Sequence, residues 1–168
     1  MGRFEKLNDD IQALADKILE DQDLCKLIHY PDNNPLDQPN VNGKRHILDK
    51  RLLLFTPKIP LAEEQGTYVL IRVPNFRPSN GGYYISSLLL FDVYVHEGTR
   101  VVYYTDNKGN EKKGDRVMLI LDRIEKIMED LGIGIGQDNL NGGGEVANNN
   151  ATFSGHSIGY ANVDFRKW

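Results

Sequence analysis

The longest regular pattern in the chain is an alternation of side chains from Tyr83 to His96, which places one set of residues on each face of an extended segment. Alternation with period two predicts a β-strand. At about 3.3 Å per residue the run would extend on the order of 45 Å, whereas a usual strand has only about 5–6 residues. Together with the apolar run from Tyr68 to Val73, it predicts a long antiparallel hairpin. We expect this hairpin to extend past the core of a small domain and to need a partner.

Two segments have the three- and four-residue apolar spacing of amphipathic helices. The first runs from about Leu7 to His29 and ends before Pro31, with Asn8 as its expected N-cap. The second runs from about Asp115 to Leu131, with Asp115 as N-cap and Gly132 as the C-terminal cap. Both helices would pack their apolar faces on the sheet.

Three shorter segments are predicted as strands: the apolar run from Arg51 to Phe55, the run from Arg100 to Tyr104, and the glycine-punctuated alternation from Phe153 to Phe165. The polar stretch from Asp106 to Gly114 is predicted as a loop, and the glycine- and asparagine-rich stretch 132–150 as irregular. The order of elements predicts an α+β fold with a mainly antiparallel sheet.

The segment from Pro31 to Gly66 contains five of the seven prolines and has no regular pattern. An irregular stretch of this length is uncommon inside a compact domain. Two interpretations stay open: an extended arm that lies on a neighbouring subunit, or a long loop that meanders over its own core. In either case residues 1–168 form a single domain, with 31–66 as the arm or loop region.

Composition narrows the classes of function. The 168 residues carry a net charge of −4, which disfavours a protein that mainly neutralises phosphates. The basic cluster from Lys44 to Arg51 keeps a nucleic-acid-binding module open as a lesser alternative. The single Cys25 rules out an internal disulfide. No apolar run approaches the roughly 20 residues that span a bilayer, so we expect no membrane partner.

No familiar catalytic constellation appears in the sequence. The four histidines are scattered and lack the spacing of a zinc site. The glycines after Leu131 close a helix, whereas a phosphate-binding loop opens one. We therefore expect no enzyme, no metal and no cofactor. The alternative is a small hydrolase or nucleotide-binding enzyme whose site would combine residues distant in the sequence: Asp92, His96, His156 and Asp164.

Two segments carry a resemblance to a known family. They are Gly114 to Ile124, within the second helix, and Phe153 to Phe165, in the last strand. With the N-terminal helix and the long hairpin, this order resembles the tail-terminator (tail-completion) proteins of tailed bacteriophages. The resemblance spans about Leu7 to Phe165. It implies an α+β subunit that forms a ring, typically six-fold, which caps the tail tube and joins it to the neck.

The resemblance implies a structural virion protein of the tail or neck that assembles in the host cytoplasm. Its expected partners are further copies of itself, the tail tube protein, and a head-completion or connector protein. DNA would pass through the ring without sequence-specific binding. The proline-rich segment 31–66 and the stretch near 139–150 look longer than this role needs, which leaves a neck adaptor or head-completion role open. No catalytic residue comes with the family.

We predict the contacts between subunits on the far part of the long hairpin and on the apolar part of the arm. In this hypothesis Tyr94 is an aromatic anchor, and its replacement by Ala would weaken assembly while sparing the subunit. The candidate interface residues are Asp92, Tyr94, His96, Leu52, Leu53, Leu54, Phe55 and Ile59.

Overall fold

The computed structural model describes residues 3–55, 65–78, 85–131, 140–146 and 152–160. Its helices and strands, in chain order, are α1 (Arg3–Glu20), α2 (Gln22–His29), η1 (Pro35–Asp37), α3 (Gly43–His46), β1 (Leu52–Leu54), β2 (Thr67–Pro78), β3 (Ile85–His96), η2 (Glu97–Thr99), β4 (Val101–Thr105), β5 (Glu111–Asp115), α4 (Arg116–Asp130), β6 (Leu140–Glu145) and β7 (Phe153–Tyr160). This is the α+β fold with an N-terminal helix that the sequence predicts.

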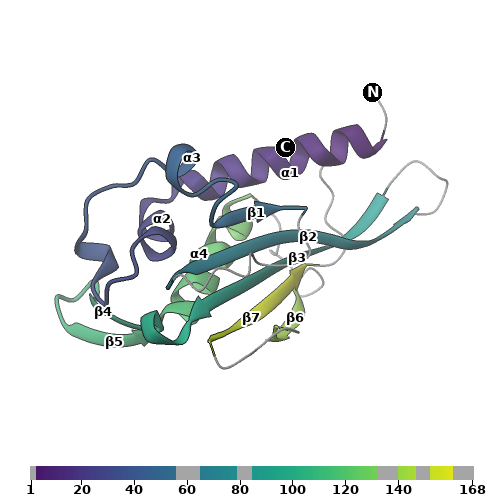
Figure 1. Ribbon diagram of the computed structural model, residues 1–168. Helices are drawn as coiled ribbons and strands as arrows, with labels where there is room; N and C mark the ends of the chain where they lie inside the picture. Colours follow the sequence, from purple (N-terminus) through teal and green to yellow (C-terminus); the bar gives the residue numbers. More distant parts are fainter. Residues whose placement is uncertain (1–2, 56–64, 79–84, 132–139, 147–151, 161–168) are drawn as a thin grey trace.

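The main sheet has five strands in the order β1-β2-β3-β7-β6. The short β1 runs parallel to β2, and the other neighbours are antiparallel. The predicted hairpin is confirmed as β2 and β3 at the centre of this sheet. A separate two-stranded ribbon, β4 with β5, stands at the end of the molecule away from Pro78 of β2 and Ile85 of β3 (Figure 1).

The predicted first helix is two helices in the structure. The break falls at Asp21, whose carboxylate accepts a hydrogen bond from the backbone N–H of Leu24 and so caps α2. Asn8, the predicted N-cap, lies inside α1. The break lets Ile18 in α1 and Leu27 in α2 both face the core, where each is 1% exposed. The predicted cap of the other helix is confirmed, because Asp115 accepts from the N–H of Val117.

The hydrophobic core lies between the helices and one face of the sheet. It joins residues of α1, α2 and α4 with Val69 and Ile71 of β2 and with Phe91, Val93 and Val95 of β3. The opposite face of the sheet carries a second, smaller apolar cluster, made of Leu53, Tyr68, Leu70, Tyr94, Val146 and Phe153. The central strand β3 is therefore buried on both faces.

Residues 31–55 lie on the subunit's own core. Val41, Ile47 and Leu52 are 6%, 0% and 0% exposed, and all three belong to the main core cluster. Of the two interpretations left open for the proline-rich region, this part follows the loop over its own core. Residues 56–64 of that region lie outside the described residues.

Two strands occupy segments whose composition predicts loops. β5 forms from the polar residues after Asn110 because it pairs with β4 in register from Val101–Asp115 to Thr105–Glu111. The turn before it has Gly109 at a φ of 80°, a conformation that glycine adopts without strain. β6 forms from the glycine-rich residues 140–145 because it pairs with β7. Gly132, the predicted C-terminal cap of the second helix, lies outside the described residues.

Candidate assembly surface

The outer third of the β2–β3 hairpin extends beyond the strands that flank it. β1 lies opposite β2 only from Val69 to Ile71, and β7 lies opposite β3 only from Leu89 to His96. Within the part of the chain that the structure describes, Asn75–Pro78 and Ile85–Leu88 therefore pair only with each other. Figure 1 shows these ends of the two strands projecting past β1 and β7, on the side of the molecule where α1 begins. We call this two-stranded segment the outer ribbon.

A register shift separates the outer ribbon from the body of the sheet. Arg72 pairs with Leu90, but the next pair is Asn75 with Leu88, so Val73 and Pro74 form an irregularity in β2. Bulges of this kind bend a strand and increase its twist. Proline lacks a backbone N–H and fits a bulge for that reason. The register shift therefore allows the outer ribbon to bend away from the direction of the inner sheet.

An apolar hollow lies at the root of the outer ribbon. Its volume is about 320 Å³. It lies between α1, the end of β1 and the irregular part of β2, and it is lined by Leu7, Asn8, Ile11, Phe55, Arg72, Val73 and Pro74. We call it the root hollow. Sequence reasoning could not find it, because its walls come from segments that are far apart in the chain.

Phe55 stands in the wall of the root hollow in an unusual conformation. Its φ is 60°, in the left-handed region that bulky side chains rarely adopt. Its backbone N–H donates to the carbonyl of Ile71 at 3.3 Å, which ties this conformation to β2. The residue is 51% exposed although it follows the buried strand β1 directly.

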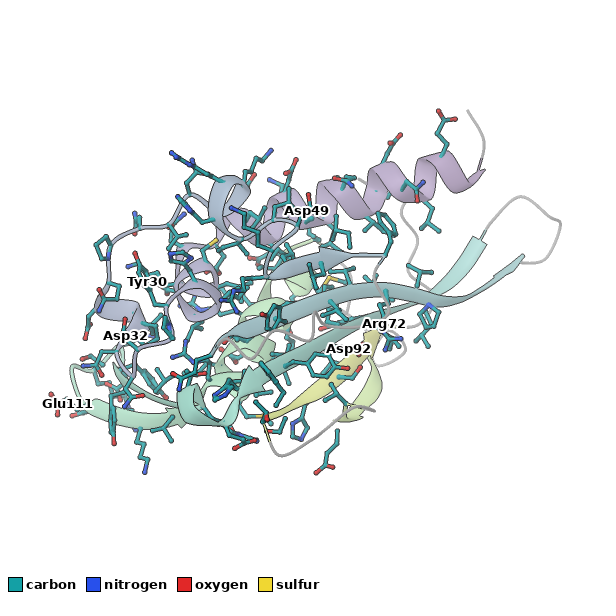
Figure 2. The ribbon with its side chains drawn as sticks, viewed as in Figure 1. Tyr30, Asp32, Asp49, Arg72, Asp92 and Glu111 are labelled. Atoms are coloured by element: carbon teal, nitrogen blue, oxygen red, sulfur yellow. The ribbon has the colours of Figure 1, made fainter. Side chains whose placement is uncertain are left out.

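The face of the sheet that carries Tyr94 also carries an ion pair, between Arg72 of β2 and the buried Asp92 of β3. Nε of Arg72 donates to Oδ2 of Asp92 at 2.5 Å, and the hydroxyl of Ser157 donates to Oδ1 of Asp92 at 2.6 Å. Figure 2 shows Arg72 and Asp92 side by side on β2 and β3. Asp92 is thus held by groups from both neighbouring strands. No single segment of the sequence contains this arrangement.

Four of the eight predicted contact residues are buried within the subunit. Leu52, Leu53, Asp92 and Tyr94 are 0%, 8%, 2% and 3% exposed. This placement differs from the surface position that the sequence predicts, and the reason is that β3 is covered on both of its faces. Leu54 and His96 are partly buried, Phe55 is exposed, and Ile59 lies outside the described residues.

The residues proposed for a catalytic alternative do not converge where they are described. Asp92 pairs with Ser157 and Val93 with His156, so Asp92 and His156 face opposite sides of the sheet. The ring of His96 packs edge-on against Phe153, and its Nδ1 accepts from the N–H of Gly98. Asp164 lies outside the described residues.

A buried arginine that sequence reasoning missed fixes the helical layer. The guanidinium of Arg116, which is 0% exposed, donates to the backbone carbonyls of Leu27, Tyr30, Asp32 and Thr99. It therefore joins the end of α2, the start of the proline-rich segment and η2 to the start of α4. Burial lowers the pKa of Arg116 to about 10, opposed by the charge of Asp32, so the group stays protonated at neutral pH. The feature of the sequence that could have indicated this role is the position of Arg116 directly after the N-cap Asp115.

The β4–β5 ribbon forms a second exposed surface. A more polar hollow of about 440 Å³ lies between η1 and this ribbon and includes Tyr103, Lys112 and Lys113. Tyr103 is 47% exposed and its N–H donates to the carbonyl of Asn33 at 2.7 Å. The ribbon is therefore anchored to the proline-rich segment along one edge.

The described residues lack two kinds of feature, a cluster of metal ligands and a membrane-spanning helix. Among them, no group of three or more His, Cys, Asp or Glu side chains is arranged to hold a metal ion. None of the helices in this part of the chain has the length and the apolar composition to cross a membrane.

Comparison with known proteins places the chain in a family. Neither the curated proteins nor the solved structures include a match to it. A family model named YomW matches residues 21–162, from the cap of α2 to just beyond the end of β7. The match covers well over half of the chain, although α1 precedes it. The chain therefore belongs to the YomW family, a phage-derived family of SPbeta-prophage-like proteins.

Proposed function

We propose that this YomW-family protein is a structural component of the phage particle. In this proposal it assembles into a homo-oligomeric ring, with six subunits, at the junction of head and tail. The ring ends the tail tube and joins it to the neck. The phage origin of the family and the α+β fold with a central hairpin support the proposal.

The observation that carries the proposal is the outer ribbon. Each strand of the hairpin has 12 residues, but the flanking strands accompany only the inner part. An isolated two-stranded ribbon is marginally stable in water, and a third strand or a packed face usually completes it. A segment of this kind on a small subunit is best explained by contact with another chain. Ring assembly needs such a contact, because a ring uses two different surfaces of each subunit.

The expected partners follow from the position of the ring. One face would contact the tail tube protein and the other a head-completion or connector protein. DNA would pass through the ring without sequence readout, and the net charge of −4 suits passage better than tight binding. The basic helix α3 does not contradict this, because Lys44 at its start is paired with Asp16 at 2.9 Å.

Two measurements test the proposal. Native mass spectrometry of the purified protein, alone and with its tail tube protein, should give a closed oligomer whose mass is a multiple of 19.1 kDa. Phage that lack the gene should accumulate separate heads and tails of irregular length, and the wild-type gene supplied in trans should restore joined particles.

Location in the particle separates the proposed role from its nearest alternatives. Electron microscopy of particles that carry an epitope tag on this protein should place the label between head and tail. Label on the head side of tailless particles would instead assign the protein to head completion. Absence of the protein from purified particles would refute a structural role altogether.

A further inference from the structure

Phe55 combines two features that the described part of one subunit does not explain. Its backbone is in the left-handed region, and its large apolar side chain is 51% exposed. Glycine or asparagine adopts this backbone at a smaller cost. Strained backbone is concentrated at binding sites, where a partner makes use of the side chain that it presents.

The surroundings of Phe55 form a surface suited to an apolar segment of protein. Leu7 and Ile11 of α1 and Val73 and Pro74 of β2 line the root hollow with Phe55. The charged group in the lining is Arg72, whose guanidinium is engaged by Asp92. The hollow borders the register shift from which the outer ribbon leaves the inner sheet, because Val73 and Pro74 line it.

The chain itself supplies a segment that needs such a surface. The outer ribbon, Asn75–Pro78 with Ile85–Leu88, has no flanking strand among the described residues. Its own root hollow lies at its inner end, at Val73 and Pro74, so the described ribbon residues lead away from that hollow along the chain. A second copy of the chain, however, has an identical hollow, which the outer ribbon of the first copy could contact. One chain therefore carries both halves of a heterologous contact, a projecting ribbon and a surface to receive it.

We propose that the root hollow of one subunit receives the outer ribbon of a second copy of this chain, with Phe55 as the central contact. This inference rests on the proposed assembly function and names the surfaces that it uses. The contact repeats from one subunit to the next. The proposed contact buries the exposed side chain of Phe55 and does not involve the buried cluster around Tyr94.

The first test separates assembly from stability. Replacing Phe55 with Gly relaxes the left-handed backbone and removes the aromatic contact. We expect Phe55→Gly to melt no lower than the wild-type subunit at dilution, while the concentration at which half of the chains are assembled rises at least tenfold. The matched control is Tyr103→Thr, because Tyr103 is an aromatic residue of similar exposure, 47%, on the β4–β5 ribbon. Sedimentation of the control should equal that of the wild type.

The second test locates the contact. Cys25 is the single cysteine and is 1% exposed, so introduced cysteines can be addressed selectively. Asn8→Cys places a thiol at the exposed rim of the root hollow, and Arg77→Cys places one on the outer ribbon. A short bis-maleimide should link the two proteins when they are mixed, and should link neither protein to itself to a comparable extent.

The outcomes distinguish this inference from the function on which it rests. A wild-type protein that assembles into a ring while Phe55→Gly assembles equally well would overturn the inference and leave the ring intact. A reciprocal dimer that depends on Phe55 and yields the mixed cross-link would keep the inference and refute the ring. Protein that stays monomeric at all concentrations, or mixed cysteine variants that do not cross-link, would overturn the inference, and binding of a small apolar molecule in the hollow without assembly would do the same.

Discussion

Arg72 and Asp92 form an ion pair across β2 and β3 in which only one charge is accessible to water. The side chain of Asp92 is 3% exposed and that of Arg72 is 32% exposed. Burying an unpaired charge costs much more than leaving one at the surface. The two halves of the pair therefore contribute unequally to stability.

The first prediction uses this asymmetry. Arg72→Met leaves a buried carboxylate that keeps, among the described residues, the hydrogen bond from the hydroxyl of Ser157, and it should lower the free energy of unfolding by about 3 kcal/mol. Asp92→Asn leaves an arginine that can turn to solvent and should cost about 1–2 kcal/mol. Urea unfolding at pH 7 measures both. Lys17→Met, which removes an exposed pair with Glu20, is the control and should change stability by less than about 0.5 kcal/mol. Equal costs for the two buried-pair variants would contradict the asymmetry.

The second prediction concerns Arg116. Its guanidinium satisfies four backbone carbonyls, among them those of Leu27 and Thr99 at 2.7 Å. Arg116→Met would leave these acceptors without donors in a buried place, and should destabilise the protein by about 3 kcal/mol or more. Arg116→Lys keeps the charge but offers one compact donor group, and should recover less than half of this loss. Full recovery of stability in the lysine variant would show that charge, and not the geometry of the guanidinium, matters here.

The third prediction concerns Tyr94. The sequence places this side chain on a contact surface, but in the structure it is 3% exposed among Leu70, Val146 and Phe153. Tyr94→Ala should therefore destabilise the subunit by about 3 kcal/mol, as removal of a buried aromatic ring usually does. Thermal melting of dilute protein measures the effect. Tyr103→Ala, at an exposed aromatic residue, should change stability by less than about 0.5 kcal/mol. A Tyr94→Ala subunit that melts like the wild type would instead favour the sequence-based hypothesis.

The elements that the sequence predicts well are those whose periodic pattern persists over a long stretch. The alternation through β3 and the apolar stripe of α4 each persist over more than ten residues, and Asp115 marks the start of α4. The break at Asp21 escaped prediction because the apolar stripe continues across it and several neighbouring residues are also acidic. β5 and β6 escaped prediction because partner strands, and not their own residues, determine their structure.

The candidate site could be predicted only in part. The place of Phe55 in an apolar run predicted it as a contact residue. The length of the hairpin predicted that it would extend past the core. The root hollow combines Leu7 with Val73, and the buried ion pair combines Arg72 with Asp92, so both depend on contacts that a local pattern does not contain. The burial of Tyr94 was missed for a related reason: an apolar residue on the outer face of a strand has the same local pattern whether its own chain or another chain covers it.

The fourth prediction is a pH dependence centred on His29. Burial lowers the pKa of His29, and the nearby charges of His46 and Arg51 lower it further. The unfolded chain then takes up a proton near pH 6.5, before the folded chain does. Stability should therefore be full above pH 6.5 and should fall as the pH drops from 6.5 to the lower pKa of the folded state.

Urea unfolding at pH 8 and pH 5 tests this dependence. His29→Gln should show a smaller difference in stability between the two pH values than the wild type shows. His46→Gln should also reduce the difference, because the interaction with His46 is one of the causes that lower the pKa of His29 and the centres of the two rings lie 5.6 Å apart. If His29→Gln retained the whole wild-type difference, other groups would be responsible for it.

The last prediction concerns the hydroxyl of Tyr160. The residue is 1% exposed, and within the described structure its hydroxyl has no hydrogen-bond partner. Its burial, with Glu125 and Glu129 nearby, raises the pKa of Tyr160 and keeps the hydroxyl neutral. A buried hydroxyl without a partner costs about 1–3 kcal/mol relative to water. Tyr160→Phe removes it while keeping the ring, which packs edge-on against Phe91 at 6.0 Å.

We therefore expect Tyr160→Phe to raise the free energy of unfolding by about 1 kcal/mol and to increase the melting temperature. Tyr160→Leu is the matched control, because it also removes the hydroxyl but loses the ring contact with Phe91, and it should be less stable than the wild type. Calorimetry of the three proteins gives the order directly. A phenylalanine variant that melts lower than the wild type would contradict the prediction. It would mean that the Tyr160 hydroxyl makes a stabilising hydrogen bond in the folded protein in solution.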